Sequence, residues 1–257
     1  MVLAQLFALA VLAAAGYLLL IGGRRLKTVW HILRNDPLPV RELHGRRGPV
    51  EIEGSAVEGD GGTVEAPFTG SRCLAYTYQV EELRSRGKSE SWKTLDRGMD
   101  GVDFVVDDGT ERVLVDPEGA DVHFESQSVT VPAGTELPDR LAEYVGSTDA
   151  VEPQDRTVNL LVTAVNLGNR QRFTERRLDV GETVYVYGQA GPGPTVEWGS
   201  DFVDALVGDG DRTPAFVISD TDERGTAWRI ARGGLWRVGA GLVAVAFGVV
   251  FAVQLAL

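Results

Sequence analysis

Few side chains in this sequence could carry chemistry: it contains one cysteine, Cys73, and three histidines, His31, His44 and His123. The histidines lack the spacing of a metal site, and one thiol cannot supply the several ligands that a cysteine-based zinc site requires. Cys73 begins an apolar run, residues 73–80, where we expect a buried structural thiol instead of a nucleophile. We therefore predict no catalytic residue, no bound metal and no cofactor.

Two loops contain residue types that also occur in metal or phosphate sites. Asp107-Asp108-Gly109 separates two apolar runs, residues 102–106 and 112–115, and has the pattern of a hairpin turn. It lacks the longer ligand series of a calcium loop. The Gly-Pro-Gly-Pro segment at residues 191–194 lacks the lysine and the helix start of a phosphate loop. Both loops are therefore expected to connect strands.

Two apolar stretches, residues 2–23 and 235–257, each reach the roughly 20 residues needed to cross a bilayer. Basic residues flank both on the side toward the middle of the sequence: Arg24, Arg25, Lys27, Arg34, Arg224, Arg229, Arg232 and Arg237. Positive flanks stay in the cytoplasm. A cleaved signal peptide is the alternative for the first stretch, but no basic residue precedes it. We expect a cell-membrane protein with two spans, a cytoplasmic central domain and both termini outside.

The composition is strongly acidic, with a formal net charge of -12. Lysine occurs only at Lys27, Lys88 and Lys93. Acidic, arginine-over-lysine usage resembles that of a salt-adapted, haloarchaeal proteome. Because nucleic-acid binding requires clustered positive charge, no nucleic acid is expected as a partner. The basic clusters beside the spans would contact anionic membrane lipid.

Between the spans, many short strands separated by glycine-rich turns predict a mainly β fold with a minor helical part. We expect a barrel-like antiparallel β domain between two transmembrane helices. The expected strands cover residues 50–54, 63–66, 73–80, 102–106, 112–115, 158–165, 170–177 and 183–187, and the expected helix covers residues 137–145. Tyr76, Trp92 and Phe104 are expected to share one core.

One short pattern occurs twice. Residues 50–56 and 184–190 both read V-x-(I/V)-x-G-x-A, which is consistent with two related β units or with chance. Small residues at four-residue spacing in the second span also predict close packing, either of the two spans on each other or on a second copy of the chain.

Several residues of the central domain form a recognisable pattern: Pro67, Gly70, Cys73, Tyr76, Trp92, Phe104, Asp108 and Gly109. As candidate family-motif residues, they resemble the GIDE domain, found between the two membrane spans of RING-type E3 ubiquitin ligases of mitochondrial and chloroplast outer membranes and in prokaryotic relatives. The stretch at residues 178–188 resembles the closing strand region of that family. The resemblance covers roughly residues 49–188 and the membrane layout. Together with the apolar stretches and the expected strands, it gives a transmembrane helix with a juxtamembrane extension at residues 1–34, a linker at 35–48, a GIDE-like β domain at 49–219, a juxtamembrane linker at 220–234 and a transmembrane helix at 235–257.

The resemblance implies the non-catalytic work of the family, which is to engage target proteins at the membrane. Ubiquitin transfer by eukaryotic members requires a zinc-binding RING, and one cysteine cannot build it. We therefore expect a module for protein interaction or scaffolding. Its expected partners are an unidentified protein and a second copy of the chain, which would associate through the membrane helices. The first alternative function is a component of a ubiquitin-like modification pathway, with ligase activity supplied in trans. The second is a membrane stress or lipid-sensing protein.

Overall fold

The computed structural model describes residues 2–32, 36–86, 89–148, 150–151, 157–160, 163–166, 169–194, 201–221 and 223–256. The chain forms two compact units. The first contains Met1–Leu38 and Thr221–Leu257, and the second is Pro39–Asp220.

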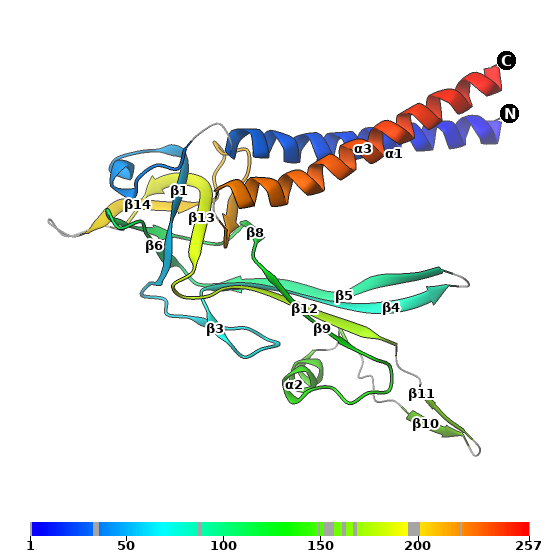
Figure 1. Ribbon diagram of the computed structural model, residues 1–257, viewed down its shortest axis with the longest axis horizontal. Coiled ribbons are helices and arrows are strands. Elements are labelled where there is room, and N and C mark those ends of the chain that lie inside the picture. The colour runs from blue at the N-terminus through cyan, green and yellow to red at the C-terminus, as the bar shows by residue number, and fades with distance from the viewer. Residues whose placement is uncertain are drawn as a thin grey trace. The chain divides into compact units, whose positions relative to one another are not determined.

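The first unit is a pair of long helices, α1 (Val2–Ile32) and α3 (Glu223–Ala256), which pack along each other (Figure 1). Glycines permit the close approach. A Cβ atom on Gly22 would lie 2.8 Å from Val238 Cγ2, and one on Gly241 would lie 2.8 Å from Leu19 Cγ. Small residues therefore mediate the contact between the two helices.

Among the described residues, one helical segment, Ile230–Val249, is long and apolar enough to cross a membrane. The apolar part of α1, Leu9–Arg24, is shorter. The structure thus supports one of the two predicted spans, and the second is not confirmed. The helix α3 also begins at Glu223, so most of the segment expected to be a juxtamembrane linker, residues 220–234, is helical.

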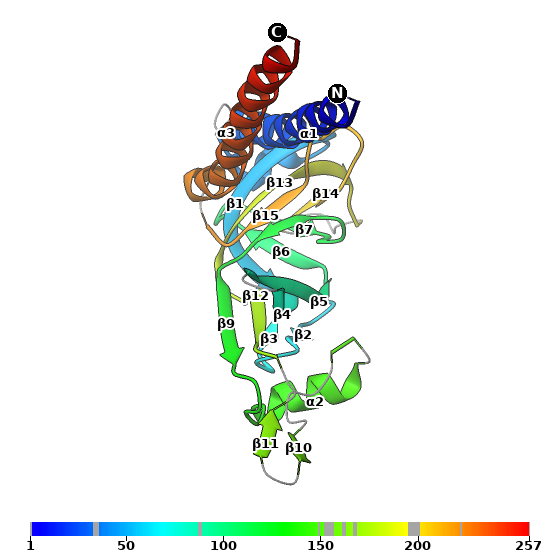
Figure 2. The same ribbon diagram turned by 90° about the vertical axis from the view of Figure 1, so that its right-hand side faces the viewer.

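The second unit is built on a closed barrel of five strands (Figures 1 and 2). These strands are β1 (Gly48–Glu58), β6 (Phe104–Asp107), β7 (Arg112–Val115), β13 (Thr183–Pro192) and β14 (Phe202–Gly208). They pair in the ring order β1-β6-β7-β14-β13, and β1 then pairs with β13. All pairs are antiparallel except β7 with β14. This connectivity is that of a five-stranded Greek-key barrel of the OB type.

The two copies of the repeated pattern form the pair that closes this ring. Val50 lies opposite Gly188, Gly54 opposite Val184, and Ile52 opposite Val186. Each glycine lies where a second strand passes closely. A Cβ atom on Gly54 would lie 2.5 Å from the Asp107 carbonyl oxygen of β6, and one on Gly188 would lie 3.0 Å from the Gly208 carbonyl oxygen of β14. The repeat therefore marks two corners of one barrel.

Two strands and a short helix extend the barrel. The strand β15 (Val217–Ser219) pairs with β13, and β8 (Asp121–His123) pairs in parallel with β15. The 3₁₀ helix η1 (Val40–Leu43) contacts β14 and β7 and buries both Val40 and Leu43. It lies within the segment expected to be a linker, residues 35–48. Its apolar side chains pack on the barrel, and this packing stabilises the short helix.

Two insertions into the barrel build a second sheet. The connection from β1 to β6 contributes β2 (Val64–Glu65), β3 (Arg72–Cys73), β4 (Ala75–Arg86) and β5 (Ser89–Gly101). The connection from β7 to β13 contributes β8, β9 (Ser126–Val131), α2 (Asp139–Ser147), β10 (Thr157–Leu160), β11 (Thr163–Asn166) and β12 (Gln171–Leu178). The second sheet has the order β5-β4-β12-β9, and β2 pairs only with β3.

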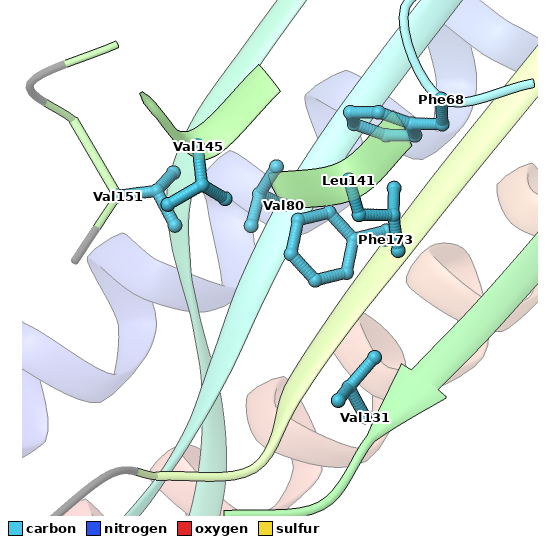
Figure 3. Packing of buried hydrophobic residues seen from close by; sticks show 7 residues of the cluster. All are labelled: Phe68, Val80, Val131, Leu141, Val145, Val151 and Phe173. Carbon is cyan, nitrogen blue, oxygen red and sulfur yellow. The ribbon is translucent and has the colours of Figure 1, made fainter. Parts of the chain in front are cut away.

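One face of the second sheet is covered by α2 and the loop after β2. The buried cluster comprises Phe68, Val80, Val131, Leu141, Val145, Val151 and Phe173 (Figure 3). The rings of Phe68 and Phe173 meet edge to face, with centroids 5.4 Å apart. This cluster is a core of its own, contributed by both insertions.

The expectation of a mainly β, barrel-like domain with a minor helical part is confirmed. Two details were wrong. Residues 158–165, predicted to be one buried strand, lie in the hairpin of β10 and β11 as far as they are described. Tyr76, Trp92 and Phe104 do not share a core, because Phe104 is buried in the barrel whereas Tyr76 and Trp92 are half-buried on the second sheet.

Replacement of Phe173 by alanine should strongly destabilise the protein. The ring is 1% exposed, and truncating such a side chain costs about 3–5 kcal/mol. We expect the thermal midpoint of the purified chain in high salt to fall by on the order of 10 °C, measured by near-ultraviolet circular dichroism. Trp92→Ala is the matched control and should cost less, because Trp92 is only partly buried. Equal losses in both variants would contradict this placement of the core.

Candidate functional site

Two of the motif residues, Pro67 and Gly70, lie in the tight turn between β2 and β3. The Gly70 amide donates to the Ala66 carbonyl over 2.9 Å, and the Ala66 amide donates to the Ser71 carbonyl. Gly70 has a φ of +69°, a conformation that favours glycine. The backbone conformation of the turn therefore explains the glycine at position 70.

A buried carboxylate holds this turn on the second sheet. Glu175 of β12 is 2% exposed, and its Oε2 accepts hydrogen bonds from the Phe68 and Thr69 amides over 2.8 and 3.3 Å. Its Oε1 accepts from the Thr69 hydroxyl over 2.6 Å and from Arg177 Nη1 over 3.0 Å. A buried charge is tolerated when it is paired and hydrogen-bonded, and both conditions hold here.

Arg177 extends this network toward the barrel. Its Nε and Nη2 donate to the two carboxylate oxygens of Asp179 over 3.1 and 3.2 Å, and Nη1 also donates to Thr69 Oγ1. The hydrogen bond to Asp179 is the main cause that raises the pKa of Arg177 above its ordinary value. We call Thr69, Glu175, Arg177 and Asp179 the turn-anchoring network. Its groups satisfy one another, so the network positions backbone and is not arranged to bind a substrate.

Cys73 lies beside this network and is fully buried. Burial, with smaller contributions from Asp179 and other charges, raises the pKa of its thiol to about 12. A thiolate is the reactive form of cysteine, and this environment opposes its formation. The thiol therefore fills space in the core, as the apolar sequence around it predicts.

Tyr76 and Trp92 lie at different places on the second sheet. Tyr76 is opposite Arg177, and burial raises the pKa of its hydroxyl to about 12. Trp92 is near the far end of the β4–β5 hairpin, where the Arg172 guanidinium lies 4.3 Å from its ring centroid. Arg172 in turn donates to Glu81 over 2.8 and 2.6 Å. Trp92 thus takes part in a local stack and not in the turn-anchoring network.

The remaining motif residues belong to the barrel. Phe104 is fully buried on β6, and Asp108 and Gly109 form the hairpin turn to β7. Burial opposes the ionisation of Asp108, but hydrogen bonds from Thr110, Val40 and Glu111 outweigh it and hold the pKa of this carboxyl below its ordinary value. Gly109 has a φ of +81°. The predicted turn is therefore confirmed, and Asp108 also fastens η1 to the barrel through the Val40 amide.

The histidines form separate pairs where the structure describes them. His44 Nε2 lies 2.6 Å from Glu111, and His123 Nε2 lies 3.4 Å from Asp121, while the side chain of His31 is outside the described residues. Within the described part of the chain, no three histidine, cysteine or carboxylate side chains gather as metal ligands.

One hollow of about 510 Å³ is bordered by acidic side chains. Its lining comprises Met99, Asp100, Gly101, Asp103, Asp116, Pro117, Glu118 and Gly119. Burial, and the neighbouring Asp116 carboxylate, raise the pKa of Asp103 above its ordinary value. Because acidic residues are abundant over the whole chain, this hollow fits a solvated acidic surface.

The structure thus brings Pro67, Gly70, Cys73 and Tyr76 together around the turn-anchoring network, whereas Trp92 and the barrel residues lie elsewhere. Our sequence analysis missed Glu175, Arg177 and Asp179. The available signal was the alternation of Glu175 and Arg177 along β12, with Asp179 directly after its end, since side chains at every second position share a face. Their partner Thr69 lies more than 100 residues earlier, which the alternation alone does not reveal.

Comparison with known proteins gives one match. The family model GIDE, described as E3 Ubiquitin ligase, matches residues 75–197, which extend from the start of β4 to just beyond β13. No curated protein and no solved structure matches the chain. The match includes all four strands of the second sheet completely, together with α2 and the closing strand β13 of the barrel. This match over residues 75–197 supports a GIDE-domain family assignment for the chain.

Proposed function

We propose that this protein is a membrane-anchored interaction module, in which a cytoplasmic GIDE domain binds a protein partner. The observation that carries the proposal is the family match over a β domain in which the motif residues maintain the structure. Cys73 is buried, and Glu175 and Arg177 are occupied by each other and by the turn. What remains for function is the surface that this framework presents.

Membrane attachment supports this role physically. We propose that both α1 and α3 cross the membrane, with the basic flanks retained inside. Attachment at both ends raises the effective concentration of the domain toward other membrane proteins. A weak contact surface can therefore be sufficient for association.

The family description favours a second candidate, a component of a ubiquitin-like modification pathway. In that case the domain would present a target or regulate an enzyme that supplies the transfer chemistry. Crosslinking in native membranes, followed by identification of the attached proteins, separates the two. Capture of a RING protein or a modifier-transfer enzyme would favour the second candidate, and capture of other membrane proteins favours the first. Capture of no protein would contradict both.

Membrane topology can be tested with two reporters. One is inserted in the hairpin between Arg86 and Ser89, and the other is fused after Leu257. Because the positive flanks are retained in the cytoplasm, the hairpin reporter should be inside and the terminal reporter outside. Protease accessibility in intact cells measures both positions. A hairpin reporter that is accessible from outside would overturn the cytoplasmic assignment.

The thiol offers a test of the non-enzymatic interpretation. With a pKa near 12, Cys73 should react with iodoacetamide at pH 8 far more slowly in the folded protein than after denaturation. Cys73→Ser should leave partner crosslinking intact, and the purified chain should contain no stoichiometric zinc. It should also fail to transfer a ubiquitin-like modifier by itself. A transfer activity that Cys73→Ser abolishes would refute the proposal in favour of an enzyme.

A further inference from the structure

The second sheet has two edge strands, β5 and β9, and they differ in protection. β5 carries Lys93, Asp96, Arg97 and Asp100, and its register against β4 shifts beside Val80. Charges and irregular register are the usual devices that prevent another strand from pairing with an edge. β9 has the sequence Ser-Gln-Ser-Val-Thr-Val and pairs regularly with β12 over all six residues. It contains no charge, proline, glycine or bulge.

The free side of β9 is open in the described part of the chain. No described strand pairs with it, and its residues from Ser126 to Thr130 are exposed. Val129 is 51% exposed, more than any other large apolar residue described in the β unit. A β-branched side chain exposed in the middle of a regular edge strand suits packing against a neighbouring strand. We call this free side, from Ser126 to Val131, the β9 edge.

The pairing with β12 determines which side chains share each face. Val129 lies opposite Phe173 and therefore on the face that α2 covers. On the other face, Ser126 lies opposite Arg176, Ser128 opposite Thr174, and Thr130 opposite Arg172. We call Ser126, Ser128 and Thr130 the hydroxyl row. An added strand would thus meet an apolar side chain on one face and hydroxyls backed by arginines on the other.

The charge on this face is positive, in a chain whose net charge is -12. Arg172 donates a hydrogen bond to Glu81 and lies over the Trp92 ring. Arg176 makes no ion pair with any carboxylate that the structure describes. A strand added to β9 would lie about 10 Å from β12, since neighbouring strands are about 4.8 Å apart. The small side chains of the hydroxyl row leave room for the long Arg176 side chain to extend over β9 toward that strand.

We propose that the β9 edge takes up an extended acidic segment of a protein partner as an additional strand. Backbone hydrogen bonds along β9 supply the affinity, a carboxylate beside Ser126 pairs with Arg176, and small apolar side chains pack on Val129. This proposal rests on the proposed interaction function and assigns its contact site and the chemistry of the partner. An anionic membrane suits the face less well, because Arg172 covers the Trp92 ring and a lipid surface cannot pair with the backbone of β9.

The test uses the full chain in phosphatidylcholine nanodiscs and a fluorescent octapeptide of alternating glutamate and valine, at fixed ionic strength. We expect binding, measured by fluorescence anisotropy, and weaker binding of a lysine–valine peptide. Arg176→Gln should weaken binding of the acidic peptide about two- to fivefold, as expected for one partly exposed ion pair. Arg97→Gln is the matched control, because Arg97 is an exposed arginine on the opposite edge and should leave the affinity unchanged.

Strand addition has a second signature in the peptide backbone. Two peptides can be made with N-methyl groups on every second residue, one on the odd and one on the even positions. In one of them the methyl groups replace the amide hydrogens that face β9, and in the other they replace those that face away. The first peptide should lose binding, and the second should keep it. Equal effects in both peptides, or equal binding of the lysine–valine peptide, would overturn the proposal.

Two further outcomes would assign the β9 edge to another occupant and overturn the proposal. One is a dimer in analytical ultracentrifugation that Val129→Glu dissociates and that excludes the peptide, which would assign the edge to a second copy. The other is loss of peptide binding when phosphatidylglycerol is added to the nanodiscs, which would assign the arginine face to lipid. Native-membrane crosslinks that are equal for the parent chain and Arg176→Gln would leave the interaction function in place and reject this site.

Discussion

Pairing of β1 with β13 closes the barrel, and every other strand of the β unit depends on that closure. β1 pairs with β13 through residues 48–55 and with β6 through residues 55–58, so the strand changes partner near Gly54. A side chain at Gly54 would collide with the backbone of β6, and a Cβ atom at Gly188 would make a tight contact of 3.0 Å with the Gly208 carbonyl oxygen of β14. Two glycines therefore allow each closing strand to contact two neighbours, and both insertions leave the barrel from strands that this ring holds in place.

The buried Glu175 carboxylate then joins the two insertions to each other. It belongs to β12 of the second insertion but accepts hydrogen bonds from Phe68 and Thr69 of the first. These two segments are separated by about 100 residues, and closing such a loop costs conformational entropy. A buried carboxylate without partners would be costly, so its hydrogen bonds also select one arrangement of the turn over others. The aromatic cluster around Phe68 can form only when that arrangement is reached.

Local features were predicted well from the sequence, and long-range ones were not. The Asp108-Gly109 turn depends on side-chain-to-backbone hydrogen bonds within four residues, which the local sequence shows. The repeated pattern was visible too, but not that its two copies pair with each other across more than 130 residues. Trp92 was misplaced because apolar character does not distinguish a core from a stack under an arginine. Val40 and Leu43 were assigned to a linker because four residues are too few to show a helical period.

The family model is described as E3 Ubiquitin ligase, but the motif residues of this chain maintain the structure of the domain. In the matched region, Glu175 and Arg177 are paired with each other and with the turn, and these contacts hold the second sheet in its shape. A rigid sheet loses little conformational entropy when a strand is added to its edge, so more of the binding energy appears as affinity. Attachment to a membrane, as proposed above, would reduce the remaining cost by confining both partners to one surface. Partner choice in this protein is therefore expected to depend on the two edges of the second sheet, of which β5 is protected by charge and β9 is not.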